Sequence, residues 1–163
     1  MTAASSNIEV PVNSSCAFCA YLEGRRPYTI FFRDELSAIL VTREQRGISH
    51  LLVVPTRHCE TILDLTDEES SAIMREIRHA ARVIDIAYGR PGIAVWQNNG
   101  IPANQTIGHV HFHVAGTLDS GGTEWGDVPE LSVTQTDAIA QRLHGAETSI
   151  SAENGSHQRR ESN

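Results

Sequence analysis

Residues 109–114 read HVHFHV, so that three histidines alternate with apolar residues. Successive side chains of a β-strand point to opposite faces, and in a regular strand His109, His111 and His113 would form a row on one face. The apolar residues between them would then face a core. Imidazole is the side chain that titrates most readily near neutral pH. The stretch therefore predicts a strand whose outer face can transfer protons, attack an electrophile or bind a metal ion.

The composition is typical of one soluble globular domain. The 163 residues are 40% hydrophobic and 20% charged, which allows a single core. The net charge of −7 disfavours a general nucleic-acid binder, which needs a basic surface. No apolar run is long enough to cross a bilayer, and residues 1–13 lack the pattern of a signal peptide. We therefore expect a cytoplasmic protein without a membrane or nucleic-acid partner.

The remaining patterns predict an α+β domain with an antiparallel sheet. One long helix is expected over residues 66–89, where Thr66 and Glu69 match a capping box and apolar side chains recur at helical spacing. We expect a domain at 14–118, an extension at 119–144 with a short helix at 134–144, and flexible ends at 1–13 and 145–163, which are mostly polar. The expected strands are 28–32, 37–42, 50–55, 92–96 and 109–117.

His111 is the candidate nucleophile because it lies in the middle of the histidine row. Imidazole can attack phosphorus and form a covalent intermediate, and neighbouring imidazoles can orient it or donate protons. The preceding loop has glycines that permit close backbone approach, Gly100 and Gly108. Its side chains that can donate hydrogen bonds to phosphate oxygens are Asn98, Asn99, Gln105 and Thr106. Together these features indicate a phosphoryl-transfer or nucleotidyl-transfer site.

Two alternatives to this interpretation stay open at the histidine row. The alternating histidines could simply form a polar outer face of the sheet. They could also bind a metal ion, although only two neighbouring imidazoles of a regular strand can share one ion, since the third lies too far along the strand.

The three cysteines, Cys16, Cys19 and Cys59, are too few for a disulfide scaffold. In a reducing compartment, the Cys-x-x-Cys pair at 16–19 indicates metal or redox chemistry. Alternatively, both thiols are simply buried, because free cysteine often packs as a small apolar side chain. We assign Cys59 no role.

Four ordered blocks resemble the histidine triad (HIT) family. HVHFHVA at 109–115 matches the signature His-φ-His-φ-His-φ-φ, where φ is apolar, and NNGIPANQTIG at 98–108 resembles the loop that precedes it. SHLLVVPTRH at 49–58 resembles the family's GHxLVIPKxH block, and CAFC at 16–19 matches many bacterial members. The resemblance covers about residues 14–117.

This resemblance implies a homodimer whose two five-stranded sheets join, and a hydrolase acting at the α-phosphorus of nucleotide conjugates. Nucleoside phosphoramidates and dinucleoside polyphosphates are the implied substrates. His111 would form a nucleotidyl-histidine intermediate, His113 would lie beside the phosphate or leaving group, and His50 would line the site. A histidine instead of a glutamine at 113 favours hydrolysis over transfer. The residues implied to hold the α-phosphate are Asn98, Gln105 and Thr106.

The resemblance also implies a structural zinc site with the ligands Cys16, Cys19, His58 and His109. Two thiolates and two imidazoles form a closed tetrahedral site of the structural kind. In that case His109 is a metal ligand and takes no part in acid–base chemistry.

The sequence departs from the family pattern at Thr42, where the family usually has an aspartate that binds both ribose hydroxyls. A hydroxyl cannot chelate a diol as a carboxylate does, so the substrate's alcohol portion could differ. Asn104 replaces a usual glycine and tolerates a positive φ. Trp125, in a glycine-rich stretch, is expected either to pack in the protein or to shape the choice of leaving group.

Two other classes of function stay open. The chain could be a non-catalytic nucleotide- or phosphate-binding module, which Thr42 favours and the intact triad disfavours. It could also be a zinc-stabilised interaction protein, which would differ in that no mononucleotide shifts its melting temperature.

Overall fold

The computed structural model describes residues 6–160, and the side chains up to residue 149. The predicted flexible ends extend beyond this range at residues 1–5 and 161–163. Within it, the elements are α1 (Ala17–Leu22), β1 (Ile30–Arg33), β2 (Ser37–Val41), β3 (Ile48–Pro55), α2 (Asp67–Tyr88), β4 (Ile93–Gln97), β5 (Phe112–Gly116) and α3 (Val133–Arg160), with short 3-10 turns at Ile62–Asp64 and Ile101–Ala103.

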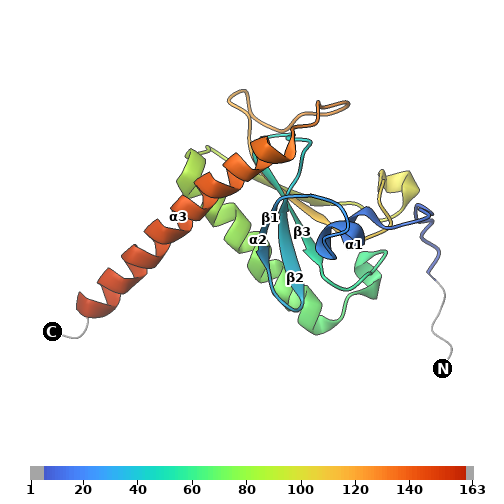
Figure 1. Ribbon diagram of the computed structural model, residues 1–163, viewed down its shortest axis with the longest axis horizontal. Coiled ribbons are helices and arrows are strands. Elements are labelled where there is room, and N and C mark those ends of the chain that lie inside the picture. Colours follow the sequence, from blue (N-terminus) through green and yellow to red (C-terminus); the bar gives the residue numbers. More distant parts are fainter. Residues whose placement is uncertain (1–5, 161–163) are drawn as a thin grey trace.

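The strands form one sheet in the order β1-β2-β3-β5-β4, and every neighbouring pair is antiparallel (Figure 1). The predicted α+β class with a five-stranded antiparallel sheet is confirmed. β3 and β5 are neighbours in the middle of the sheet, although more than 50 residues separate them along the chain. Their pairing places the segment around His50 beside the histidine row.

The long helix α2 has the signals that the sequence predicts. Thr66 accepts a hydrogen bond from the Glu69 backbone, the Glu69 side chain accepts one from the Thr66 backbone, and Gly89 ends the helix at φ 57°. α2 and the first half of α3 cover one face of the sheet (Figure 1). The fully buried residues of this layer include Ile39, Leu51, Val53, Val83, Ile84, Val114 and Leu143.

The opposite face is covered in part by α1. Phe18 and Leu22 of this helix pack on Leu40, Leu52 and Val54 in a second, smaller core. The Cys16 sulfur caps α1 by accepting a hydrogen bond from the Cys19 backbone at 3.4 Å. The sequence analysis placed no helix here, because six residues are too few for a periodic pattern to show.

Two predicted elements were wrong in their extent. β5 begins at Phe112, so His109 and His111 lie before the strand and the regular row over 109–117 does not form. The Val110 backbone N–H donates to the Cys59 carbonyl, which draws this segment away from the ladder. α3 begins at Val133 and continues to Arg160, whereas the sequence predicted a helix ending at 144.

Among the described side chains, the apolar contacts that anchor α3 all come from its first half. Ala140, Leu143 and Ala146 join the core against α2 and β1, and the helix then continues beyond the sheet (Figure 1). The division into a domain at 14–118 and an extension at 119–144 stays a prediction, as does the flexibility of the two ends. Across residues 6–160, no helix has both the length and the apolar character needed to cross a membrane.

Candidate active site and metal centre

His50, His111 and His113 meet in one cavity of about 290 Å³ on the α1 face of the sheet. The register brings them together, because Leu52 lies opposite His113, and His50 lies two pairs further along, opposite Ala115, on the same face of the sheet as Leu52. Two more predicted site residues, Thr42 and Thr106, line the same cavity. Its other lining residues are Phe18, Tyr21, Arg26, Tyr28, Arg43, Glu44, Arg46, Leu52, Ile107 and Glu130.

A backbone carbonyl decides which nitrogen of His111 can act as a nucleophile. His111 Nδ1 lies 2.7 Å from the carbonyl oxygen of His109. A carbonyl can only accept, so Nδ1 carries the proton and donates it, which leaves a lone pair on Nε2. Burial lowers the pKa of His111 below its ordinary 6.5, which favours the neutral, nucleophilic form at neutral pH.

His50 and His113 form a hydrogen-bonded pair, with 3.0 Å between His50 Nε2 and His113 Nδ1. His50 Nδ1 lies 3.0 Å from the carbonyl of Glu44 and 3.3 Å from the backbone N–H of Arg46. With its proton on Nδ1, the nitrogen donates in the shorter of these contacts, and Nε2 then accepts from His113. The His113 ring also stacks on Trp96 at 4.6 Å, with 1° between the ring planes. Burial lowers the pKa of His50 to about 4 and that of His113 to about 2, so both rings are neutral at pH 7.

The C-terminal extension forms one wall of the cavity. Arg43 donates from Nε to the Leu131 carbonyl at 2.6 Å and pairs with Glu130 at 3.1 Å. Arg46 donates to the Gly126 carbonyl at 2.7 Å. The sequence does not predict that these two arginines line the site. They lie in a polar loop that carries no motif, and their carbonyl partners are more than 75 residues away along the chain.

Trp125 is not packed inside this chain, contrary to one of the two interpretations of its role. Its side chain is 86% exposed. Arg46 contacts the residues on both sides of Trp125. Its side chain donates to the Gly126 carbonyl, and its own backbone carbonyl accepts a hydrogen bond from the Glu124 backbone N–H at 2.6 Å. The indole therefore stands on a segment that is anchored to a residue lining the cavity.

Asn98 and Gln105 do not line the cavity; they stabilise the loop that precedes the triad. Gln105 Nε2 donates to the carbonyls of Glu60 and Ile107, and its Oε1 accepts from the Gly100 backbone at 2.6 Å. Asn98 donates to the carbonyl of Ala103. Both amide N–H groups of Gln105 are already used, so the structure does not bring this side chain to a phosphate as the resemblance implied.

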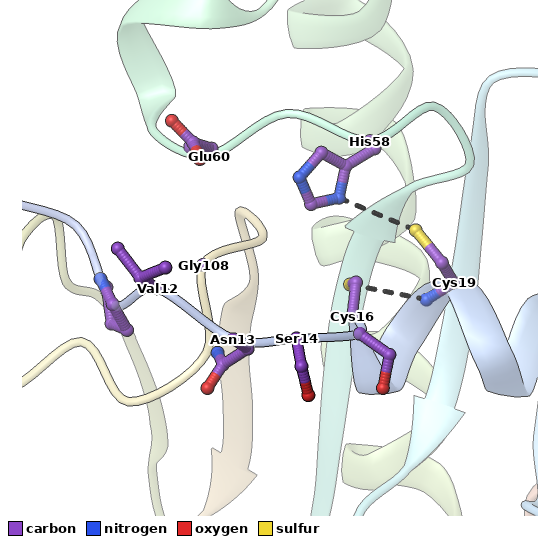
Figure 2. Close-up of a pocket in the computed structure, with 10 residues that line it drawn as sticks. Val12, Asn13, Ser14, Cys16, Cys19, His58, Glu60 and Gly108 are labelled. Carbon is purple, nitrogen blue, oxygen red and sulfur yellow. Dashed lines mark hydrogen bonds between the residues drawn. The ribbon is translucent and has the colours of Figure 1, made fainter.

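The glycines of this loop allow the close approach of the N-terminal segment. A Cβ on Gly108 would lie 2.7 Å from the Pro11 carbonyl oxygen, and one on Gly100 would lie 2.8 Å from the Ile8 side chain. The Ile101 backbone N–H donates to the Glu9 carbonyl at 2.7 Å. The segment then leads past Gly108 into Cys16, beside an open cavity of about 350 Å³ (Figure 2).

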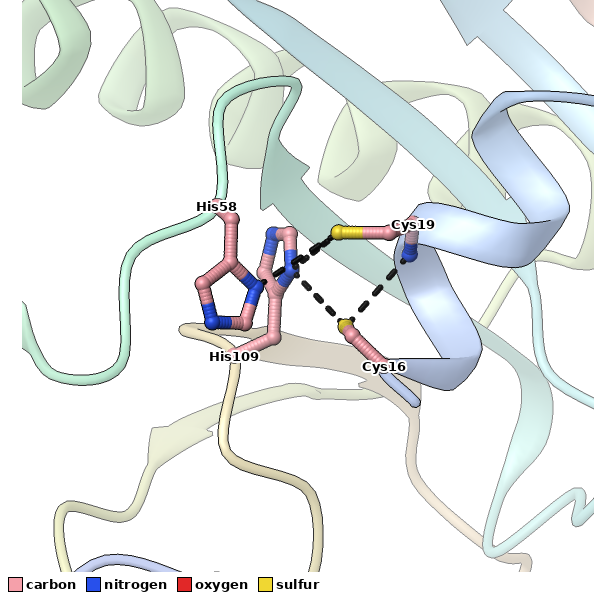
Figure 3. A group of neighbouring side chains, drawn as sticks. All are labelled: Cys16, Cys19, His58 and His109. Atoms are coloured by element: carbon pink, nitrogen blue, oxygen red, sulfur yellow. Dashed lines mark hydrogen bonds between the residues drawn. The ribbon is translucent and has the colours of Figure 1, made fainter. Parts of the chain in front are cut away.

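The four predicted metal ligands converge in space (Figure 3). The sulfurs of Cys16 and Cys19 and the Nδ1 atoms of His58 and His109 all lie within 4.8 Å of one another. His109 Nδ1 is 3.3 Å from the Cys16 sulfur and 3.7 Å from the Cys19 sulfur, and His58 Nδ1 is 3.5 Å from the Cys19 sulfur. A tetrahedral zinc ion with ordinary bond lengths requires S···N distances of about 3.6 Å, so the donor set fits zinc.

The tautomer of His109 also suits a bound cation. His109 Nε2 donates to the Pro55 carbonyl at 3.0 Å, which leaves the Nδ1 lone pair facing the sulfurs. Burial, and next the neighbouring Cys16, raise the pKa of Cys19 to about 11. A raised pKa favours the protonated thiol, and a bound divalent cation would reverse this and hold Cys16 and Cys19 as thiolates. Cys59 is buried apart from this cluster and donates to the Arg57 carbonyl.

Comparisons with known proteins identify the family and the fold of this chain. An uncharacterised HIT-like protein of Methanocaldococcus jannaschii is 27% identical over 132 residues, 80% of this chain and 99% of the relative. An adenosine 5′-monophosphoramidase of Schizosaccharomyces pombe is 31% identical over 100 residues, 61% of this chain and 72% of the relative. A zinc-bound histidine triad family protein of Mycobacterium smegmatis has the same fold, with a TM-score of 0.72 at 22% identity over 85% of this chain and 97% of that one. The family model of the HIT domain matches residues 23–119, and the chain therefore belongs to the HIT domain family.

Proposed function

We propose that this protein is a hydrolase that cleaves nucleotide conjugates at the α-phosphorus, with His111 as the nucleophile. Nucleoside phosphoramidates and dinucleoside polyphosphates are the substrate classes. One observation carries the proposal: the hydrogen bond from His111 Nδ1 to the His109 carbonyl, which leaves an unprotonated Nε2 in a cavity with two further imidazoles. A relative named as an adenosine 5′-monophosphoramidase supports the substrate class.

The reaction would proceed in two displacements at phosphorus. In the first, His111 Nε2 forms a bond to the α-phosphorus, and the bond to the leaving amine or phosphate breaks with its electron pair on the leaving group. The negative charge of the bound phosphate favours a protonated imidazole beside it, so the His50–His113 pair supplies the leaving group's proton. In the second, water attacks the phosphorus, its proton returns to that pair, and His111 is released.

Hydroxyl and guanidinium groups of the cavity wall suit a phosphate substrate. Thr42 and Thr106 can donate hydrogen bonds, and the guanidinium groups of Arg43 and Arg46 line the same cavity, whose imidazoles are neutral. We propose that the phosphate oxygens contact Thr106, while Thr42 faces the alcohol portion. Asn98 and Gln105 act only through the loop that they stabilise.

We further propose that Cys16, Cys19, His58 and His109 hold a structural zinc ion. The ion would supply no chemistry to the reaction: it would tie α1 to the segment just before His111. The proposal includes a homodimer joined through the edge strand β4, where Val95 is 50% exposed, with Trp125 near a leaving-group subsite. The cytoplasmic location stays a prediction from the sequence.

The deciding experiment is turnover of an adenosine phosphoramidate that releases a fluorescent amine. We expect wild type to turn it over and His111→Ala to be slower by a factor of about 10⁴ or more, because a unit of catalytic groups loses its nucleophile. His79→Ala is the matched control, because His79 lies on α2 outside the cavity.

A folded wild type that releases no amine would contradict the hydrolase. In that case a nucleotide-binding module stays as the second candidate, which Thr42 favours, and it predicts that AMP raises the melting temperature without turnover.

A further inference from the structure

The catalytic cavity has two chemically different ends. The imidazoles of His50, His111 and His113 form one end. Phe18 lies between the two ends, because its ring centroid is 5.2 Å from that of His111 and 6.3 Å from that of Tyr21. A phosphate that His111 attacks must lie at the imidazole end, so the alcohol portion of the substrate extends past Phe18 to the other end.

Tyrosine rings and a guanidinium form this second end. The rings of Tyr21 and Tyr28 stack at 4.0 Å with 17° between their planes, and the Arg26 guanidinium lies 5.1 Å from the Tyr21 ring centroid. The hydroxyl of Tyr28 accepts from the Arg43 backbone at 3.3 Å, which places it next to Thr42 along the chain. Tyr21, Arg26, Tyr28 and Thr42 all line the cavity, and we call these four residues the alcohol subsite.

The alcohol subsite has an unbalanced positive charge. Of the arginines that line the cavity, Arg43 pairs with Glu130 at 3.1 Å and Arg46 pairs with Glu44 at 3.0 Å. Arg26 has no carboxylate within ion-pair distance among the residues that the structure describes. The two acidic residues of the lining are therefore matched by two arginines, and the third arginine is left to attract an anion.

We propose that the substrate's ribose carries a second phosphate, on its 2′ or 3′ hydroxyl, and that Arg26 binds this phosphate. The inference rests on the proposed function and specifies its substrate. A carboxylate at position 42 would chelate a free ribose diol and repel a phosphate, whereas the Thr42 hydroxyl can donate to a phosphate oxygen. A guanidinium has the fork of donors that matches phosphate, and its stacking on Tyr21 holds it in position.

Calorimetric titration of wild type with AMP, adenosine 2′,5′-bisphosphate and adenosine 3′,5′-bisphosphate tests the proposal directly. We expect one of the bisphosphates to bind about tenfold or more tightly than AMP, as one charge-assisted contact allows. Arg26→Gln should reduce this preference to within about threefold. Arg25→Gln is the matched control, since Arg25 has the same charge, pairs with Glu23 at 2.5 Å and does not line the cavity.

A second variant tests the same site in the opposite direction. Thr42→Asp should weaken the binding of the bisphosphates and strengthen that of AMP, because the new carboxylate repels the second phosphate and accepts from free ribose hydroxyls.

Equal affinities of wild type for AMP and both bisphosphates would overturn the proposal, as would a preference that survives in Arg26→Gln. If adenosine phosphoramidate is turned over while no preference exists, the proposed hydrolase stands and only the second phosphate is rejected. If wild type neither binds these nucleotides nor turns over the phosphoramidate, both proposals fail together.

Discussion

At the scale of single residues, burial keeps the imidazoles of the cavity neutral at pH 7 before a substrate binds, and we propose that a bound phosphate then favours protonation of the His50–His113 pair. His50 is 1% exposed and spends both ring nitrogens on hydrogen bonds, to the Glu44 carbonyl and to His113. Its own backbone is set by Ser49, which has φ 61°, in the left-handed region, where the strand bulges. Burial disfavours the charged imidazolium, and this lowers the pKa of His50 to about 4, although the hydrogen bond to the Glu44 carbonyl favours the protonated form.

This pKa predicts that acid destabilises the fold. The folded pKa of His50 lies below the ordinary 6.5, so the unfolded chain binds the proton more tightly, and stability falls as the pH falls from about 6.5 to about 4. The contribution of His50 amounts to about 3 kcal/mol over this range. Urea unfolding at pH 7 and pH 4 should show a loss for wild type that exceeds the loss for His50→Gln by about this amount, because the other buried histidines destabilise both proteins in acid. An equal loss in both proteins would show that His50 is not the group responsible.

At the scale of elements, short irregular segments do more to build the site than the long helix does. Residues 98–108 are held by the Gln105 side chain and by the N-terminal segment, which crosses Gly108 at Pro11. The same loop leads directly into His109 and His111. Packing of the N-terminal segment against the loop therefore supports both the metal centre and the nucleophile.

We predict that Gly108→Ala displaces the N-terminal segment, because the new Cβ would lie 2.7 Å from the Pro11 carbonyl oxygen. Overpacking of this kind costs about 1–3 kcal/mol. Hydrogen exchange should show faster exchange at residues 8–12 in the variant. Gly145→Ala is the control: its Cβ meets no atom within 4 Å, and alanine favours the helix α3, so stability should rise by about 0.5–1 kcal/mol. Unchanged exchange at residues 8–12 would show that Gly108 is not required for the packing of this segment against residues 98–108.

At the scale of the whole molecule, two sets of side-chain contacts connect distant parts of the chain. The proposed zinc site joins residues 16–19, 58 and 109, and the wall of the histidine cavity joins the arginines of the β2–β3 loop to residues 126–131. Each connection closes a long loop, so that its loss is expected to loosen segments far apart in the sequence.

Removal of zinc is the first test at this scale. We expect elemental analysis to find one zinc per chain in wild type and none in Cys16→Ser, with a lower melting temperature for the variant because the metal binds only the folded state. Cys59→Ser is the control, since Cys59 lies outside the cluster. A metal-free wild type whose melting temperature matches that of Cys16→Ser would exclude the structural ion.

The proposed homodimer makes a separate prediction for β4. Light scattering should give a mass of about twice 17.9 kDa for wild type. Val95→Lys places a charge at an exposed apolar position of the edge strand, so it should shift the protein to the monomer. Met74→Lys, on the exposed side of α2, should leave the mass unchanged if β4 is the interface. A monomeric wild type would contradict this assembly.

The sequence by itself determined the five strands and the long helix α2 in outline, and the residue types that carry the chemistry, but not the helix α1 or the full extent of α3. Local signals, such as the capping box at Thr66, the αL glycine at 89 and the β-branched runs, act within a few residues and are therefore visible in the chain. Only the tertiary structure decided how those residues are used. It began β5 at Phe112, so that His109 lies before the strand that holds His113. It placed the Gln105 side chain in hydrogen bonds within its own loop, packed Gly108 against the N-terminal segment, and brought Arg26, Arg43 and Arg46 to the cavity. These outcomes depend on contacts between residues far apart in the chain, and no local pattern encodes such contacts.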